Sequence, residues 1–303
     1  MEQLAVNLLG PMEVRQLGRM VPIPTGKVRT LLAMLLLEQD RTLRRATVYS
    51  ELWGDAAPAS AAANLRNYLS ELRVWAMELG AHLVQGHDGW SLAIGGSLDA
   101  LQFQTAIDEG RRARGRGDRA TAIKCLASAV ALYRDSPMLD VPQGPLLYGY
   151  AQVLLVRWQS AVEECAELLI EAGEPDRACL LLYSFLGRQP YRERAWGLLM
   201  VACSSSGDVA AAIDAYQRAC GYLAGDLNVR PSPLLMSLYE AILRGDPQVR
   251  LGCGPKPRSH FGPFLDTGSR TPGDAQRMGL CHTRSRFHLI VLVGMGAGRP
   301  TAR

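Results

Sequence analysis

The sequence predicts a mainly α-helical protein: an N-terminal winged helix-turn-helix with a small β-sheet, a tetratricopeptide-like helical domain and a disordered C-terminal tail. Three observations support this fold class. Short strands, helices and a hairpin follow one another over the first 97 residues, and only helical periodicity, partly repeating, continues from there to about residue 247. Gly, Pro and Arg then dominate the remainder. We therefore expect three parts, at 1–97, 98–247 and 248–303.

The first part alternates between strand and helix signals. Two short apolar stretches, 3–9 and 20–23, predict strands separated by Gly-Pro and Gln-Leu-Gly. Apolar spacing and a turn at Gly-His-Asp-Gly then predict three helices and a hairpin, at 27–38, 45–53, 60–79 and 82–94. We expect Gly54 to end the second helix and Ser60 to cap the third.

The third helix has two different faces. Leu65, Leu69, Leu72 and Ala76 recur at the helical period and predict a buried stripe. The opposite face carries the polar side chains Arg66, Asn67, Ser70 and Arg73. Strands, three helices and a hairpin are the order of a winged helix, whose third helix enters the major groove of DNA while the hairpin forms the wing. The alternative is that this face is ordinary solvated surface.

The helical part contains a repeat of 34 residues. Its second copy matches the tetratricopeptide spacing at Trp196, Leu199, Gly207, Ala212, Tyr216 and Ala219. The first copy has Val162, Cys165, Gly173, Ala178, Leu182 and Phe185 at the same positions. A further helix pair is expected at 101–115 and 118–133. Such repeats leave a groove for peptides or sister helices, and a helical bundle without repeats is the alternative.

Composition limits the class of protein. Hydrophobic residues make up 48% and charged residues 20% of the chain, as in folded soluble proteins. Its apolar runs are far shorter than the roughly 18 residues that span a bilayer, so we expect no membrane partner. The first residues lack the basic stretch of a signal peptide, which predicts a cytoplasmic protein.

Charge and cysteine content give further limits. Residues 1–98 hold nine basic and nine acidic residues, whereas 251–303 hold eight and two, so the basic excess belongs to the tail. The chain has seven cysteines without a Cys-x-x-Cys pair, which favours reduced, buried thiols. Its five histidines lack metal-ligand spacing, and no nucleophile and base stand in a recognisable pattern. We expect no metal, no cofactor and no catalytic activity.

Several segments resemble one family over about residues 4–247: "LLGPMEV", "ELWGD", "NLRNYLSELR", "LDALQFQTAI", "YRERAWGLLM" and "AAIDAYQRACGYLAGDLNVRPSPLLMSLYEAILRGDP". They are similar to the antibiotic regulatory proteins of actinomycetes (SARP). The resemblance implies an OmpR-like winged helix followed by a bacterial transcriptional activator domain. It also implies a homodimer on double-stranded DNA, bound to direct repeats upstream of biosynthetic gene clusters, that recruits the RNA polymerase holoenzyme.

The candidate DNA contacts lie on the third helix and beside it. Arg66 and Asn67 can make the bidentate contacts that distinguish guanine and adenine, and Ser70 lies on the same face. Arg73 is better placed for a phosphate. The remaining candidates flank the helix: Arg44, Arg45 and His87. The two flanking arginines either contact the phosphate backbone of the DNA or are exposed to solvent without a partner role.

Two positions depart from the family pattern. Glu71 stands where a basic residue is common, and His87 and Asp88 stand at a wing turn that usually carries arginine. Both changes weaken phosphate attraction. Glu71 either accepts a hydrogen bond from cytosine or only repels phosphate.

The C-terminal "HLIVLVGMGAGRPTAR" is similar to the start of the nucleotide-binding domain of larger SARP relatives. Pro300 occupies the position of the essential lysine and no helix follows, which predicts no nucleotide binding. No receiver domain precedes the winged helix, so OmpR-type phosphorelay control is a fold analogy only.

The sequence leaves a second functional hypothesis open. The neutral N-terminal part is compatible with a repeat-based protein-interaction scaffold that binds DNA weakly or not at all. A third hypothesis, an enzyme, is supported only by the glycine-rich C-terminal end. We take a DNA-binding transcriptional activator as the main prediction.

Overall fold

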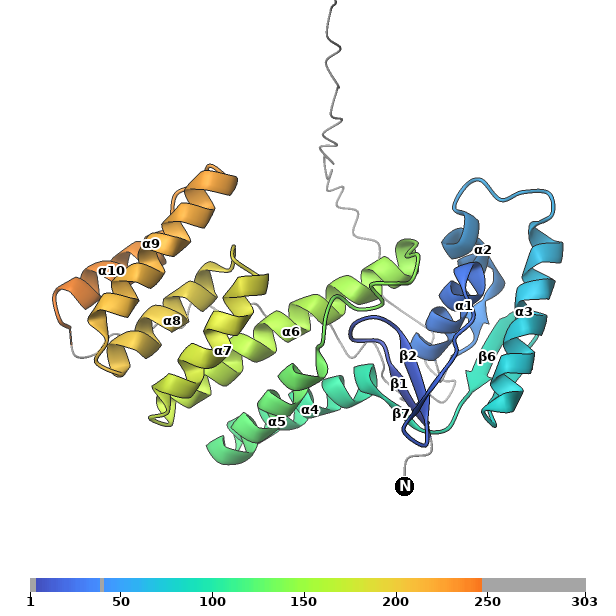
Figure 1. Ribbon diagram of the computed structural model, residues 1–303, viewed down its shortest axis with the longest axis horizontal. Coiled ribbons are helices and arrows are strands. Elements are labelled where there is room, and N and C mark those ends of the chain that lie inside the picture. Colours follow the sequence, from blue (N-terminus) through green and yellow to red (C-terminus); the bar gives the residue numbers. More distant parts are fainter. Residues whose placement is uncertain (1–3, 39–40, 247–303) are drawn as a thin grey trace, which may run out of the picture. The chain divides into compact units, whose positions relative to one another are not determined.

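The computed structural model describes residues 4–38 and 41–246 (Figure 1). The tail predicted for 248–303, with its glycine-rich end, lies outside the described residues. Within the described ranges the chain is mainly helical, with two small sheets before the helical domain. The predicted fold class is confirmed there.

The first sheet has the strand order β3-β2-β1-β7. Its strands are β1 (Leu4–Asn7), β2 (Glu13–Gln16), β3 (Arg19–Val21) and β7 (Ser97–Leu98). The first three pair antiparallel, and β7 pairs parallel to β1. The two strands predicted at 3–9 and 20–23 correspond to β1 and β3, whereas β2 was missed because its four residues include a single apolar side chain, Val14.

Three helices and a second sheet follow, in the predicted order (Figure 1). The helices are α1 (Gly26–Leu37), α2 (Arg45–Trp53) and α3 (Ala61–Glu78). The second sheet, of order β4-β6-β5, contains β4 (Leu43–Arg44), β5 (His82–Gln85) and β6 (Gly89–Ala93). The predicted hairpin is thus confirmed, and Gly54 ends α2 at a φ of 58°.

One predicted helix cap is wrong. Ser60 does precede α3, but its backbone is helical (φ −81°, ψ 0°) and its side chain accepts no hydrogen bond from the backbone of α3. The hydroxyl oxygen instead lies 3.2 Å from the side-chain nitrogen of Asn64, which donates to it. A capping residue needs an extended backbone to direct its oxygen at the helix, and Ser60 lacks that conformation.

The helical domain is a succession of antiparallel neighbours (Figure 1). Its helices are α4 (Asp99–Gly115), α5 (Arg119–Leu132), α6 (Pro145–Glu171), α7 (Pro175–Arg188), α8 (Glu193–Ser205), α9 (Val209–Asp226) and α10 (Pro233–Leu243). None of these or the preceding described helices is long and apolar enough to cross a membrane.

The repeat positions occupy equivalent places in two helix pairs. Trp196 and Leu199 of α8, and Ala212 and Ala219 of α9, are at most 1% exposed. The earlier copy is buried too, at Val162, Cys165, Ala178, Leu182 and Phe185. The two repeat glycines both have positive φ, +76° at Gly173 and +83° at Gly207, in the turns between the paired helices. The tetratricopeptide assignment itself stays a prediction.

The cysteines of the described helices are free thiols. Burial raises the pKa of Cys165 to about 11 and that of Cys179 to about 12. Thiols with such pKa values are almost fully protonated at neutral pH and therefore react slowly. Cys165 and Cys203 are buried, as predicted, whereas Cys125, Cys179 and Cys220 are partly exposed.

Candidate nucleic-acid interface

The two faces of α3 differ as its sequence predicts. Leu65, Leu69, Leu72 and Ala76 are buried against the rest of the winged helix. The ring nitrogen of Trp75 donates to the carbonyl of Pro22 at 2.9 Å, which attaches the helix to the segment after β3. The inner side of α3 is therefore held in place by packing and by a partly buried hydrogen bond.

The outer face of α3 is open to solvent. We use this name for the exposed residues Ala63, Arg66, Asn67, Ser70 and Val74. Arg73, the predicted phosphate contact, is half-buried at one edge, and Glu71 is exposed at the other. The structure thus brings the three predicted base-reading residues together on one exposed helical surface.

Arg44 and Arg45 lie at the start of α2, beside the wing. Arg44 belongs to β4, and Arg45 is the first residue of α2, in agreement with the helix predicted at 45–53. The backbone nitrogen of Arg45 donates to the carbonyl of Asp88 at 3.1 Å. Its guanidinium carbon lies 5.4 Å from the ring centre of Trp90. The N-terminus of α2 has no side-chain cap and no acidic residue in its first turn, so its dipole favours an anion.

The wing tip is fully solvated. The side chain of His87 is 99% exposed and that of Asp88 is 79% exposed. Their Nδ1 and Oδ1 atoms lie 2.8 Å apart. The turn is closed by a hydrogen bond from the nitrogen of Gly86 to the carbonyl of Gly89 at 2.9 Å. A side chain at Gly89 would place its Cβ 2.0 Å from the carbonyl oxygen of Leu43, so β4 can approach the wing only at a glycine.

An aromatic cluster joins the three helices of the winged helix. The ring centres of Tyr49 and Trp53 in α2 lie 5.2 Å apart, and Trp53 stacks on Tyr68 of α3 at 6.4 Å. The amino group of Lys27 in α1 lies 4.7 Å from the Trp53 ring. Sequence reasoning missed this cluster, although aromatic residues four apart on one helix, Tyr49 and Trp53, are a signal that could have revealed half of it.

The candidate arginines lack acidic partners within the described part of the chain. Arg44, Arg45, Arg66 and Arg73 form no ion pair there. Several arginines of the helical domain, by contrast, are neutralised by neighbouring carboxylates. Arg111 pairs with Glu164 at 2.8 Å, and Arg192 pairs with Glu163 at 2.7 Å. The positive charges around α3 therefore remain available for an anionic partner.

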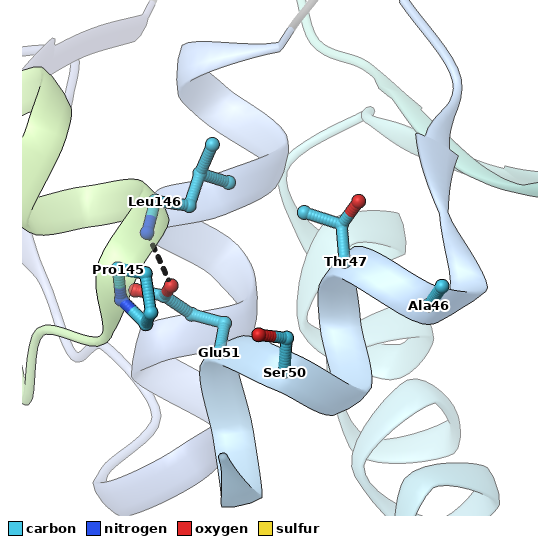
Figure 2. A pocket seen from close by; sticks show the side chains of 6 residues that line it. All are labelled: Ala46, Thr47, Ser50, Glu51, Pro145 and Leu146. Atoms are coloured by element: carbon cyan, nitrogen blue, oxygen red, sulfur yellow. Dashed lines mark hydrogen bonds between the residues drawn. The ribbon is translucent and has the colours of Figure 1, made fainter. Parts of the chain in front are cut away.

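Besides Glu163, the carboxylates of Asp99 and Glu51 are buried away from this surface, and sequence reasoning missed both. Asp99, the first residue of α4, accepts hydrogen bonds from the backbone nitrogens of Leu8 at 2.7 Å and Leu9 at 2.9 Å. Burial raises its pKa, and those two hydrogen bonds partly oppose the shift. Glu51 of α2 borders a pocket of about 470 Å³ that is lined by α2 and the start of α6 (Figure 2).

A metal site is not evident in the described ranges. Across residues 4–38 and 41–246, no group of three or more His, Cys, Asp or Glu side chains could hold a metal ion.

Comparison with known proteins identifies relatives of this chain. Residues 98–243 match the family model of the bacterial transcriptional activator domain. The transcriptional regulatory protein MoaR1 of Mycobacterium tuberculosis is 31% identical over 244 residues, which cover 78% of each chain. The regulatory protein AfsR of Streptomyces coelicolor is 32% identical over 256 residues, which cover 81% of this chain and 25% of AfsR.

A solved structure shows the same architecture. EmbR of Mycobacterium tuberculosis, solved in complex with a low-affinity phosphopeptide, is similar with a TM-score of 0.72 and 29% sequence identity. The match covers 82% of this chain and 66% of that one.

Proposed function

Because the chain belongs to the SARP family of transcriptional regulators, we propose that it is a sequence-specific DNA-binding activator that reads promoter direct repeats with α3. The observation that carries the proposal is the outer face of α3. Arg66, Asn67 and Ser70 are exposed to solvent there, while the apolar stripe on the opposite side of the helix is buried. The family match covers the helical domain, so the DNA-binding role rests on this face.

Base readout is assigned to the outer face. From the N-terminal half of α3, Arg66 reaches guanine O6 and N7, and Asn67 reaches adenine N6 and N7, through paired hydrogen bonds. Ser70, about one turn further along, hydrogen-bonds either a base or a phosphate. Each paired contact contributes about 1–3 kcal/mol of discrimination against the wrong base.

Backbone contacts are assigned to the flanking residues. Arg73 at the edge of the outer face meets one phosphate, and Arg44 and Arg45 meet another at the uncapped N-terminus of α2. His87 extends from the wing tip towards the adjacent groove. These contacts orient the protein on the duplex and carry little sequence information.

The division of labour follows the proposed domains. Residues 1–97 bind DNA, and 98–247 form a tetratricopeptide-like activator domain that mediates self-association on DNA and contacts the RNA polymerase holoenzyme. The target is the promoter of a secondary-metabolite, antibiotic-type gene cluster, and the protein acts in the cytoplasm without a cofactor or catalytic step. Family membership and the absence of competing chemistry in the sequence support this proposal.

The decisive experiment measures binding to duplexes selected from a random pool by the wild-type protein. Arg66→Ala and Asn67→Ala are each expected to relax preference at one base-pair position. Arg73→Ala is expected to weaken binding to all duplex sequences equally. It is also expected to lower the slope of log affinity against log salt concentration by about one unit. Fluorescence anisotropy over a salt series measures both effects.

Arg112→Ala is the matched control. Arg112 is an exposed arginine of α4 that forms no ion pair within the described chain. The control loses the same charge and is expected to keep wild-type preference. If Arg66→Ala and Asn67→Ala also keep it, the outer face of α3 is solvated surface and the groove assignment is wrong.

A protein-interaction scaffold is the competing function. It is favoured by the zero net charge of residues 1–98, with nine basic and nine acidic side chains. A scaffold predicts weak binding without preference among duplexes, whereas the proposed activator predicts steep salt dependence together with a selected sequence.

A further inference from the structure

The start of α6 is capped by a residue of the winged helix. The carboxylate of Glu51, in α2, accepts hydrogen bonds from the backbone nitrogens of Gly144 at 2.8 Å, Leu146 at 2.7 Å and Leu147 at 3.1 Å. Figure 2 shows the side chain directed from α2 to the first turn of α6. Since Pro145 has no N–H group, these three donors are all that the first turn of α6 offers from Gly144 to Leu147.

No residue of α6 itself could replace this cap. Gly144 has no side chain, and the first turn of α6 contains no acidic residue. Glu51 is buried, with only 8% of its surface exposed. The negative charge also meets the positive end of a helix of 27 residues.

Gly144 permits the close approach. A Cβ at this residue would lie 2.8 Å from the carboxyl carbon of Glu51 and 2.8 Å from its backbone carbonyl oxygen. The φ of Gly144 is −92°, which any residue can adopt. The glycine is therefore required by the contact with Glu51 and not by its backbone conformation.

Glu51 is also linked to α3 through its own helix. It lies in the same helix as Trp53, which stacks on Tyr68 of α3 at 6.4 Å. The neighbouring contacts secure α1 in the same region, because Thr30 donates to the carbonyl of Pro142 at 3.2 Å and Arg29 pairs with Asp140 at 2.9 Å. A continuous path of packed residues thus runs from α3 through α2 to α6.

We infer that Glu51 is a positioning residue that holds α3 in one orientation relative to the helical domain, and thereby selects the spacing of the direct repeats that a dimer can bind. The inference rests on the proposed function. When two helical domains associate, rigidly attached recognition helices meet only repeats at one helical phase, whereas loosely attached ones accept many spacings.

The test uses the full chain and duplexes with one copy or two copies of a selected half-site. Wild-type protein is expected to bind the preferred spacing at least about tenfold more tightly than a duplex with about five extra base pairs, half a helical turn. In Glu51→Ala this ratio is expected to fall to about twofold or less, while affinity for a single half-site stays within about twofold of wild type. A merely structural defect would lower both affinities together and leave the ratio unchanged.

Two further variants complete the test. Gly144→Ala disturbs the same contact from the α6 side and is expected to relax the spacing ratio in the same way. Ser50→Ala, beside Glu51 at the pocket, changes no hydrogen bond of the described chain and is expected to keep the wild-type ratio. A wild-type ratio in both Glu51→Ala and Gly144→Ala would overturn the inference.

A second measurement does not depend on DNA. Hydrogen exchange of the full chain should show the amides of Gly144, Leu146 and Leu147 exchanging at least about tenfold faster in Glu51→Ala than in wild type, with α3 unchanged. Unchanged protection of these amides would also overturn the inference. Failure of the wild-type protein to bind any selected duplex would instead contradict the proposed function, and the exchange result would still test the contact.

Discussion

At the scale of single residues, Glu71 distinguishes phosphate repulsion from base readout by α3. It is exposed at the edge of the outer face of α3, next to Ser70. We expect Glu71→Arg to bind every duplex more tightly and to steepen the salt dependence by about one unit, because a repelling carboxylate becomes a phosphate contact. Anisotropy titrations on selected and scrambled duplexes measure this.

Glu78→Arg provides the control for that substitution. Glu78 is exposed in the last turn of α3, away from Arg66 and Asn67, and the charge change is the same. If Glu71→Arg instead loses preference at a single base pair, Glu71 accepts a hydrogen bond from cytosine and the repulsion account is wrong.

Asp99 is the residue with the clearest expected pH dependence. Both of its carboxylate oxygens accept backbone N–H groups, so Asp99→Asn would oppose one of those donors with an amide N–H₂. We expect a loss of about 1–3 kcal/mol of unfolding free energy. Urea unfolding of both proteins at a series of pH values measures it.

The sign of the pH effect follows from the raised pKa. Burial lifts the pKa of Asp99 above its ordinary value of 3.8, so the folded chain takes up a proton at higher pH than the unfolded chain. Stability from this group therefore increases as pH falls through the raised pKa, is complete below 3.8, and is lost as pH rises. The advantage of wild type over Asp99→Asn should grow on acidification by at most about 1.4 kcal/mol per pH unit. An advantage that shrinks on acidification contradicts this account.

At the scale of elements, Trp196 tests the packing of the repeat helices. Its ring is 1% exposed, stacks on Tyr222 of α9 at 6.0 Å, and donates from its nitrogen to the carbonyl of Pro190 at 2.7 Å. We expect Trp196→Ala to cost about 3–5 kcal/mol of unfolding free energy, because it leaves a cavity between α8 and α9. Leu180→Ala, on the 73% exposed Leu180 of α7, should change stability by no more than about 0.5 kcal/mol. An unchanged unfolding midpoint in Trp196→Ala would refute the repeat register.

At the scale of the whole molecule, we expect that the tail can be removed without loss of the fold. In the described chain the buried apolar core extends from Leu4 to Ile242. A chain without 251–303 is therefore expected to unfold at the wild-type midpoint, measured by circular dichroism. It loses eight basic and two acidic residues, so its affinity for non-specific DNA should fall while sequence preference stays. Insolubility of the shortened chain would show that the tail contributes to the core.

Local sequence patterns were sufficient to predict the elements that bury one face and expose the other. The apolar spacing of α3 predicted both its extent and its outer face, because Leu65, Leu69 and Leu72 repeat at the helical period. The hairpin of the wing was predictable from its Gly-His-Asp-Gly turn. The repeat was predictable because similar residues recur 34 positions apart in the sequence. Strands β4 and β7 were missed because two residues are too short to show any period.

The sequence by itself determined the order of the first three helices and the hairpin, and which residues of α3 face outward, since periodicity records burial within a single element. Only the tertiary structure decided how those elements are held together. Glu51 caps a helix that begins 94 residues later, and Asp99 binds the backbone of Leu8 and Leu9 about 90 residues before it. A buried carboxylate and its distant N–H partners share no local pattern. Their pairing arises because a buried charge is stable only where the fold supplies donors, which no single segment contains.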